Sequence, residues 1–263
     1  MAAAAAAAAA AKVVGKAPSA AVVAALAPTG TLRAAINMSN FLLVTDKTED
    51  GLPIGVSASL AAHVAARLGV PLTLMPYPSP PALCEAAGPG ESAWDIGNIG
   101  ADPLRGEFIN FTAPYAEIES TVLLPPGSAV ESFADLDTEG ATIITAKGGA
   151  YSLWLERNVQ HATLVQETGA AVKERFVAEG LDAMAGLRPA LVSDALLAEG
   201  YTVMPGHYGL VEQATGVPKA KGEEAFEWLR EWIEEVKANG LVSSLVDEFG
   251  VQGNLLVAPA AKL

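Results

Sequence analysis

The stretch that decides the fold, residues 94–128, reads WDIGNIGADPLRGEFINFTAPYAEIESTVLLPPGS. Its first part, 95–100, is a short apolar run whose glycines leave little side-chain bulk, which predicts a buried strand approached closely at its end. Asp102 and Pro103 then form a pair typical of a helix start, with aspartate as cap and proline in the first turn. Arg105 follows, so we expect backbone N–H groups beside a guanidinium. That combination suits a carboxylate.

The rest of the stretch adds an aromatic patch and a second strand. The aromatic residues are Phe108, Phe111 and Tyr115. The apolar segment 121–124 is extended in character and is bounded by two prolines and a glycine. A bounded strand of this kind is expected to carry the chain from one domain into another.

The order of these motifs resembles that of a known family. Three motifs around two strands resemble, in their order, those of the extracellular solute-binding proteins of family 3. They are G-x-D-P-x-R (100–105), F-T-x-P-Y (111–115) and P-x-G-S (125–128). These proteins are the receptors of polar amino-acid ABC transporters. The resemblance implies the two-lobed type II periplasmic-binding-protein fold, an α/β architecture in which each lobe is a mostly parallel sheet flanked by helices and two strands form a hinge.

The resemblance extends over about residues 26–258. Segment 26–33 is similar to the family's entry into its first strand, and 60–70 to its first helix. Segment 146–154 is similar to the turn that opens lobe two, and 180–191 to a strand of small residues near the ligand. No single motif decides the assignment, but the ordered series is specific.

Composition agrees with a globular binding protein and excludes several other classes. The chain has 263 residues and 51% hydrophobic residues, enough for one large or two medium-sized cores. Its net charge of −14 repels phosphates, which argues against nucleic acid and anionic membrane surfaces as partners. Any anion site must therefore be locally basic.

Cofactors and metals are not expected. Cys84 is the sole cysteine, so no internal disulfide can form, and the three histidines lack the spacing of a zinc site. No Ser/His/Asp or Cys/His constellation is present, so we assign no catalytic residue. We expect a monomer whose partners are a small carboxylated solute and, by the resemblance, a membrane permease.

The amino terminus does not resemble a standard signal peptide. Ten alanines follow Met1 without a preceding basic region, and 20–26 is too short to span a bilayer. We interpret residues 1–25 as an alanine-rich tail. The family resemblance implies a periplasmic or extracellular location, whereas the missing signal leaves a cytoplasmic one open.

Helix and strand patterns alternate regularly from Thr31 onward, which predicts α/β layering. The expected strands are 32–37, 71–77, 94–100, 121–124, 141–146, 164–167, 183–186 and 201–204. The expected helices are 60–68, 79–87, 150–158, 170–178, 189–197 and an amphipathic segment at 226–249.

Two crossings of the chain between lobes define the expected domains. If 121–124 and 201–204 are these crossings, lobe two is inserted into lobe one, and the adjacent linkers form a hinge. Lobe one then comprises 26–120 and 206–263, and the hinge strands with lobe two comprise 121–205. The resemblance predicts that the ligand is clamped between the lobes.

Ligands of open α/β sheets bind beyond the carboxyl ends of the strands, which directs attention to particular loops. The resemblance implies that Arg105 grips the ligand carboxylate bidentately, although a solvated Arg105 paired with Glu107 is the alternative. The further candidate ligand-binding residues are Asn40, Phe41, Gly100, Ala101, Asp102, Gly149, Ala150, Tyr151 and Arg188.

Simpler structural roles exist for several of these residues. The 148–150 turn is either a strand-to-helix connection or a helix N-terminus that holds a carboxylate. Phe41 and Tyr115 are interpreted as core aromatics in preference to stacking partners. Turn chemistry alone accounts for Asn40.

The chain departs from the family pattern after segment 182–186. Amino-acid binders of the family place there an aspartate that receives the ligand's ammonium, whereas this chain has Leu187 and Arg188. We therefore expect Arg188 to select ligands without a free α-ammonium, such as a keto acid or a dicarboxylate. The alternative is that Asp194 or another acid neutralises Arg188 within the protein.

Two functions from different classes follow. The first is a binding protein without catalytic activity. The second is an enzyme on the same fold, because cyclohexadienyl and arogenate dehydratases resemble this family and use a carboxyl acid to protonate a leaving hydroxyl. Glu117, Glu119 and Asp194 are the candidate acids. A cytosolic sensor domain is a third reading.

Overall fold

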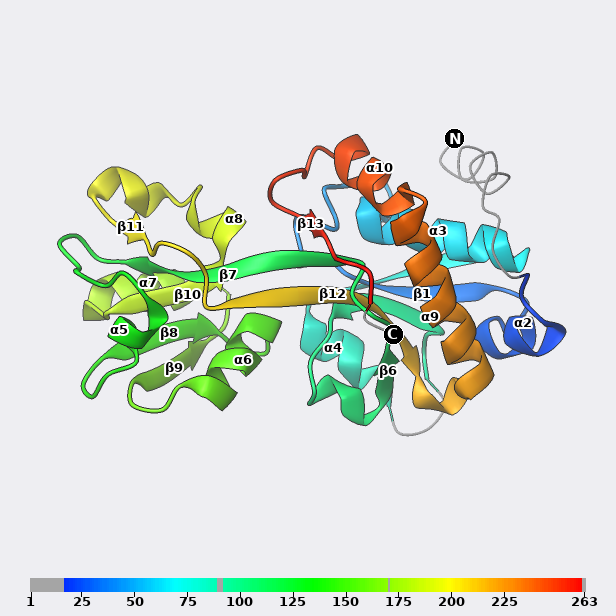
Figure 1. Ribbon diagram of the computed structural model, residues 1–263, viewed down its shortest axis with the longest axis horizontal. Helices are drawn as coiled ribbons and strands as arrows, with labels where there is room; N and C mark the ends of the chain where they lie inside the picture. Colours follow the sequence, from blue (N-terminus) through cyan, green and yellow to red (C-terminus); the bar gives the residue numbers. More distant parts are fainter. Residues whose placement is uncertain (1–16, 89–91, 170, 262–263) are drawn as a thin grey trace. The chain divides into compact units, whose positions relative to one another are not determined.

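The computed structural model describes residues 17–88, 92–169 and 171–261 (Figure 1). The chain folds into two compact units. Unit 1 consists of the residues up to Glu117 and from Glu212 onward, and unit 2 consists of Ile118–Val211. Residues 1–16 of the predicted tail lie outside the described residues.

The sheet of unit 1 has a parallel centre with antiparallel additions. Strand β1 (Leu32–Asn37) lies between β4 (Leu72–Tyr77) and β5 (Ile96–Gly100) and is parallel to both. The long strand β12 (Gly209–Pro218), which begins in unit 2, continues this sheet antiparallel to β5, with Gln213 opposite Gly100. Strand β6 (Ile109–Phe111) pairs with the end of β12, and β13 (Leu256–Val257) pairs with the first residues of β7 (Ala116–Leu124).

Helices cover both faces of this sheet (Figure 1). Helix α3 (Val56–Leu68) ends at Gly69, whose φ of 71° is the left-handed conformation that glycine adopts at helix ends. Helix α4 (Pro80–Glu85) packs through Leu83 on the face that carries Ala35 and Ile99. The short helix α2 (Ala20–Leu26) is capped by Ser19, and a small hairpin joins β2 (Asp46–Lys47) to β3 (Pro53–Ile54).

The predicted amphipathic segment 226–249 forms two helices. Helix α9 (Glu223–Ala238) follows the 3-10 turn η3 (Lys219–Lys221), and α10 (Leu241–Glu248) follows a break at Gly240, where φ is 83°. Helix α9 packs against α2, and α10 packs against α3 and α9. The apolar face of α9 buries two tryptophans, Trp228 and Trp232, as the 3.6-residue period predicts.

Unit 2 repeats the parallel arrangement. Strand β8 (Thr142–Ala146) lies between β9 (Thr163–Glu167) and β10 (Ala183–Leu187) and is parallel to both. Strand β7 is antiparallel to β10, and the short β11 (Thr202–Val203) pairs with the end of β7. The helical elements are α5 (Phe133–Leu136), α6 (Ala150–Asn158), α7 (Ala171–Glu179), α8 (Arg188–Leu191) and the 3-10 helix η2 (Ala195–Glu199).

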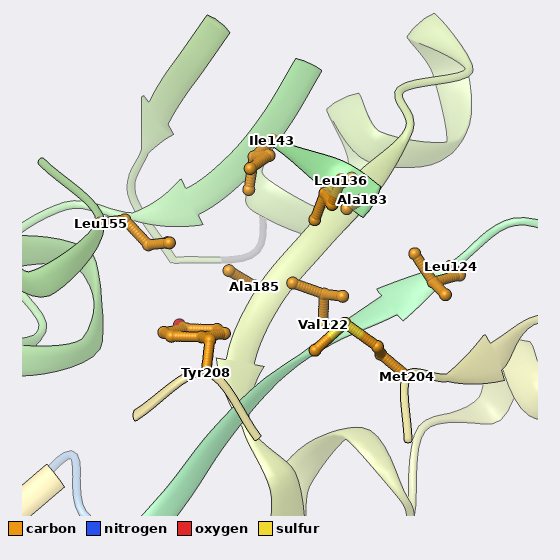
Figure 2. Packing of buried hydrophobic residues seen from close by; sticks show 9 residues of the cluster. All are labelled: Val122, Leu124, Leu136, Ile143, Leu155, Ala183, Ala185, Met204 and Tyr208. Carbon is orange, nitrogen blue, oxygen red and sulfur yellow. The ribbon is translucent and has the colours of Figure 1, made fainter. Parts of the chain in front are cut away.

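Two apolar clusters form the core of unit 2. Ile143 and Leu155 belong to the cluster on the α6 side, whereas Ile144 and Phe176 belong to the cluster on the α7 side. Successive residues of β8 thus point to opposite faces, as in any strand covered on both sides. Figure 2 shows the nine buried residues of the α6 cluster, to which β7, β8 and β10 all contribute.

The predictions for segments 201–204 and 189–197 differ from the structure. Segment 201–204, expected as the second crossing, instead forms β11 inside unit 2, and the chain leaves this unit along β12. Turn residues on both sides made the short segment resemble a complete strand, while the two glycines and the charged residue of β12 concealed the longer one. The predicted helix 189–197 is divided into α8 and η2, with Asp194 capping the second.

Candidate ligand-binding loops

The topology of each unit directs two loops to one edge of its sheet. In unit 1 the chain passes from β1 through α3 to β4 on one side, and α4 returns it to β5 on the other side. The loops after β1 and β5 therefore diverge at the carboxyl ends of adjacent parallel strands. Such a switch point is where open α/β sheets bind ligands. In unit 2, β8 and β10 form the same arrangement, with the connections through α6 and α7.

The loop after β1 is held by its own amide side chains. Asn37 Oδ1 accepts hydrogen bonds from Ser39 N at 3.2 Å and from Ser39 Oγ at 2.8 Å. Asn40 is buried, and its Oδ1 accepts a hydrogen bond from Leu42 N at 3.2 Å, so turn chemistry accounts for its side-chain oxygen. Phe41 is 45% exposed, so the interpretation of Phe41 as a core aromatic is wrong. Tyr115 is fully buried, which agrees with that interpretation.

The loop after β5 uses its backbone donors internally. Ala101 N donates to Glu212 O at 2.7 Å, and Leu104 N donates to Asp102 Oδ1 at 2.9 Å. Gly106 N donates to Asp102 O at 3.0 Å, and the 3-10 helix η1 (Arg105–Glu107) follows. Asp102 thus closes a turn through Leu104 N, but the residue before η1 is Leu104, which has no capping side chain, so the predicted helix start at Asp102 and Pro103 is wrong. The three N–H groups are not available to a ligand.

Arg105 is a buried residue of this loop. Its side chain donates a hydrogen bond to Gly100 O, and only 8% of the residue is exposed. Burial lowers the pKa of Arg105, while Cys84 and then Asp102 oppose that shift. The alternative of a solvated surface arginine is wrong. A cation held at this depth requires negative charge nearby, from the protein or from a ligand.

In unit 2, the loop after β8 leads into the N-terminus of α6. Gly149 is the cap residue and provides no side-chain hydrogen bond, so Ala150 and Tyr151 begin the helix without a capping side chain. A Cβ on Gly149 would lie 2.9 Å from Tyr151 Cε1, so the Tyr151 ring lies directly against this turn. Uncapped N–H groups and the helix dipole favour an anion here.

Two buried hydroxyls of unit 2 lack a well-formed hydrogen bond. Thr145 Oγ1 and Tyr208 Oη have no hydrogen-bond partner of normal geometry among the described residues. Thr145 belongs to the end of β8 and, by strand alternation, faces the same side as Ile143, toward α6. Burial and then the neighbouring Tyr151 phenol raise the pKa of Tyr208, while the Ser120 hydroxyl opposes the shift. Tyr151 packs against the same apolar cluster as Tyr208. Sequence analysis did not single out Thr145 or Tyr208.

The loop after β10 carries a cluster of charged side chains. Arg188 Nε lies 2.6 Å from Glu119 Oε2, and Arg188 Nη2 donates to Met204 O at 3.3 Å. His207 Nδ1 lies 3.5 Å from Glu119 Oε1. The predicted internal neutralisation of Arg188 is therefore present, and Glu119 provides it. Asp194 instead pairs with Lys173 Nζ at 2.6 Å.

Metal and membrane features are absent from the described ranges. No group of three or more histidine, cysteine, aspartate or glutamate side chains in residues 17–88, 92–169 and 171–261 is arranged to hold a metal ion. None of the helices in these ranges is both long and apolar enough to cross a bilayer.

Comparison with known proteins decides the family. The family model described as bacterial extracellular solute-binding proteins, family 3, matches residues 32–252. The chain belongs to this family. No curated protein matches the chain. The fold of this family member is the type II periplasmic-binding-protein fold, as the order of motifs around β5 and β7 predicted.

Solved structures similar to this family member include binding proteins from two bacteria and a reconstructed ancestor. An ancestral amino-acid-binding protein, a precursor of cyclohexadienyl dehydratase, has 21% identity, a TM-score of 0.66, and coverage of 86% of this chain and 98% of its own. A binding component of an ABC transporter from Wolinella succinogenes, complexed with lysine, has 22% identity, a TM-score of 0.66 and coverage of 85% and 97%. The amino-acid ABC transporter substrate-binding protein AbpA from Streptococcus pneumoniae, bound to arginine, has 18% identity, a TM-score of 0.66 and coverage of 86% and 98%. At these identities the likeness establishes the fold alone.

Proposed function

We propose that this solute-binding protein holds a small carboxylated molecule, an amino acid, keto acid or dicarboxylate, for an ABC transporter. The observation that carries the proposal is the position of Arg105, a buried guanidinium at the carboxyl end of β5. Planar guanidinium groups bind carboxylates through two parallel hydrogen bonds, and such contacts are strong where water is excluded. The net charge of −14 makes a local cation necessary for any anionic ligand.

The loops of unit 2 support the same class of ligand. The uncapped N-terminus of α6 and the buried hydroxyl of Thr145 provide donors for an oxygen-rich group. Buried polar groups in native proteins are nearly always satisfied, so a ligand or ordered water is expected to complete them. The clamp implied by the family resemblance and the partner permease remain predictions.

A thermal-shift screen tests the proposal. The screen measures the melting temperature with amino acids, keto acids and dicarboxylates, because a ligand that binds only the folded state stabilises it by mass action. We expect at least one carboxylated compound to raise the melting temperature of the wild type and to lose most of this effect with Arg105→Gln. The control Arg230→Gln removes an exposed arginine that pairs with Glu227. A panel without any stabilising carboxylate contradicts the proposal.

A dehydratase is a second candidate because the pKa of one of the candidate acids, Glu117, is raised, which favours its protonated form. Burial and then the nearby Glu212 raise the pKa of Glu117, while Lys237 opposes the shift. Asp194 is less suited, since its burial is outweighed by hydrogen bonds from Lys173 and Leu196 N, which lower its pKa. Glu119 is held by Arg188. Absorbance assays with prephenate and arogenate distinguish the candidates, because only an enzyme consumes these compounds and only an enzyme loses that activity with Glu117→Gln.

A further inference from the structure

We propose that Arg188 is an anion-binding residue of unit 2 and that Glu119 is the counter-ion that the ligand's anionic group displaces. The inference rests on the proposed function and narrows its ligand class. The ligand is then an organic acid with an anionic group and no ammonium at the end that contacts unit 2, such as a dicarboxylate or a 2-keto acid.

Arg188 lies at the end of a strand of unit 2 where a ligand can bind. Strand β10 ends at Leu187, which lies opposite Ser120 of β7, so Arg188 and Glu119 are the next cross-strand neighbours. Strand β8 lies on the other side of β10 and is parallel to it. The loops after β8 and β10 consequently emerge at the same edge of the sheet, at the switch point of unit 2. Pro189, in the first turn of α8, restricts the backbone that carries Arg188.

The Arg188 guanidinium has fewer hydrogen-bond partners than it has donors. Only 25% of the Arg188 side chain is exposed, and a guanidinium has five N–H donors. The 2.6 Å contact from Nε to Glu119 is not aligned as a hydrogen bond, and the bond from Nη2 to Met204 O is long at 3.3 Å. Within the described residues the Arg188 guanidinium makes no other hydrogen bond or ion pair. This geometry leaves the planar edge of the group without the bidentate partner that it binds best.

Glu119 has a second neighbour, His207, besides Arg188. His207 Nδ1 lies 3.5 Å from Glu119 Oε1, and 41% of the His207 side chain is exposed. A carboxylate that leaves Arg188 therefore still has the His207 imidazole beside it, and 32% of its own side chain already contacts solvent. Replacement of Glu119 by a ligand carboxylate exchanges one anion for another, so the partly buried guanidinium is not left unpaired.

The same cluster permits an opposite reading, in which Glu119 receives a ligand ammonium and Arg188 only positions it. The two readings predict opposite effects of one substitution. Glu119→Gln removes the competing anion and should tighten the binding of dicarboxylates if Arg188 is the anion-binding residue. If Glu119 accepts an ammonium, the same substitution should weaken the binding of amino acids.

Isothermal titration calorimetry of the full chain with succinate, 2-oxoglutarate, glutamate and glutamine tests the inference. We expect the two acids without an ammonium to bind best, Glu119→Gln to strengthen their binding about tenfold, and Arg188→Gln to weaken it at least about tenfold. Arg188→Lys keeps the positive charge but lacks the planar guanidinium, so it should retain only part of the wild-type affinity. Arg175→Gln, which removes an arginine paired with Glu167 and Glu179 of the same unit, should change nothing.

Three results overturn the inference. The first is that the Glu119→Gln protein binds succinate and 2-oxoglutarate more weakly than the wild type. The second is that the wild type prefers glutamate and glutamine. The third is that Arg188→Gln and Arg188→Lys proteins with wild-type melting temperatures bind the two acids with unchanged affinity. Loss of acid binding in Arg105→Gln together with unchanged binding in Arg188→Gln contradicts this inference alone. If the wild type binds none of the carboxylated compounds tested, this result contradicts the proposed function and the inference with it.

Discussion

The carboxylate of Asp95 accepts hydrogen bonds from Arg33 Nε at 3.0 Å and from Arg33 Nη2 at 2.8 Å, and it is completely buried. Lys221 forms an ion pair with the same carboxylate, and Arg33 N donates to it at 2.8 Å. One aspartate thus joins β1, the start of β5 and the turn η3 that follows β12. These are the elements that position the unit 1 loops.

Asp95→Asn should therefore destabilise the protein strongly. The substitution leaves two cations without their counter-ion in a buried setting, which typically costs about 3 to 5 kcal/mol. Urea unfolding measures the loss. The exposed pair Glu227–Arg230 provides the control, because Glu227→Gln should change the free energy of unfolding by less than about 1 kcal/mol. A similar small effect of both substitutions would show that the Asp95 cluster does not stabilise unit 1.

His63 predicts a dependence of stability on pH. Burial lowers the pKa of His63, and Glu248 only partly opposes the shift. The unfolded chain, with a histidine pKa of about 6.5, then binds a proton that the folded chain resists, so this residue reduces stability as the pH falls below about 6.5. The urea concentration at the unfolding midpoint should fall from about pH 7 to about pH 5.5, and this fall should be larger in the wild type than in His63→Gln. Equal falls in both proteins would contradict the assignment.

Gly149→Ala should weaken ligand binding with little effect on stability. The backbone of Gly149, with φ of −68° and ψ of 147°, is accessible to alanine, but the new Cβ would lie 2.9 Å from Tyr151 Cε1 and displace that ring. We expect a change in unfolding free energy below about 1 kcal/mol and a clear loss of affinity in calorimetry. In a Tyr151→Leu background the same substitution should cost no further affinity. An additive loss would mean that Tyr151 does not mediate the effect.

The regular helices and strands could be predicted from the sequence because residues close to each element determine where it begins and ends. Strand β1 and helix α6 lie at the predicted residues, since apolar periodicity is bounded by turn-forming residues on either side. Strand β12 could not be predicted in this way. Its glycines and polar residues are stabilised by pairing with β5 and β6, which are distant in sequence.

The candidate site could be predicted only in part for the same reason. Arg105 could be proposed as a site residue because its motif is contiguous in the sequence, and its role in binding stays a prediction. The partner of Arg188 could not be identified from the sequence, because antiparallel pairing of β7 with β10 brings Glu119 to it across a large sequence separation. The alternation of Glu117 and Glu119 on β7 was the available signal, but alternation alone does not show which strand lies opposite.

The most direct test of carboxylate binding by Arg105 is calorimetric titration of the wild type and Arg105→Gln with the best ligand from the thermal-shift screen. We expect the substitution to cost about 2 to 5 kcal/mol of binding free energy, because it breaks a buried charge pair with the ligand. The melting temperatures of the ligand-free proteins establish that both are folded. Equal affinities of two folded proteins for a carboxylated ligand would contradict the role assigned to Arg105.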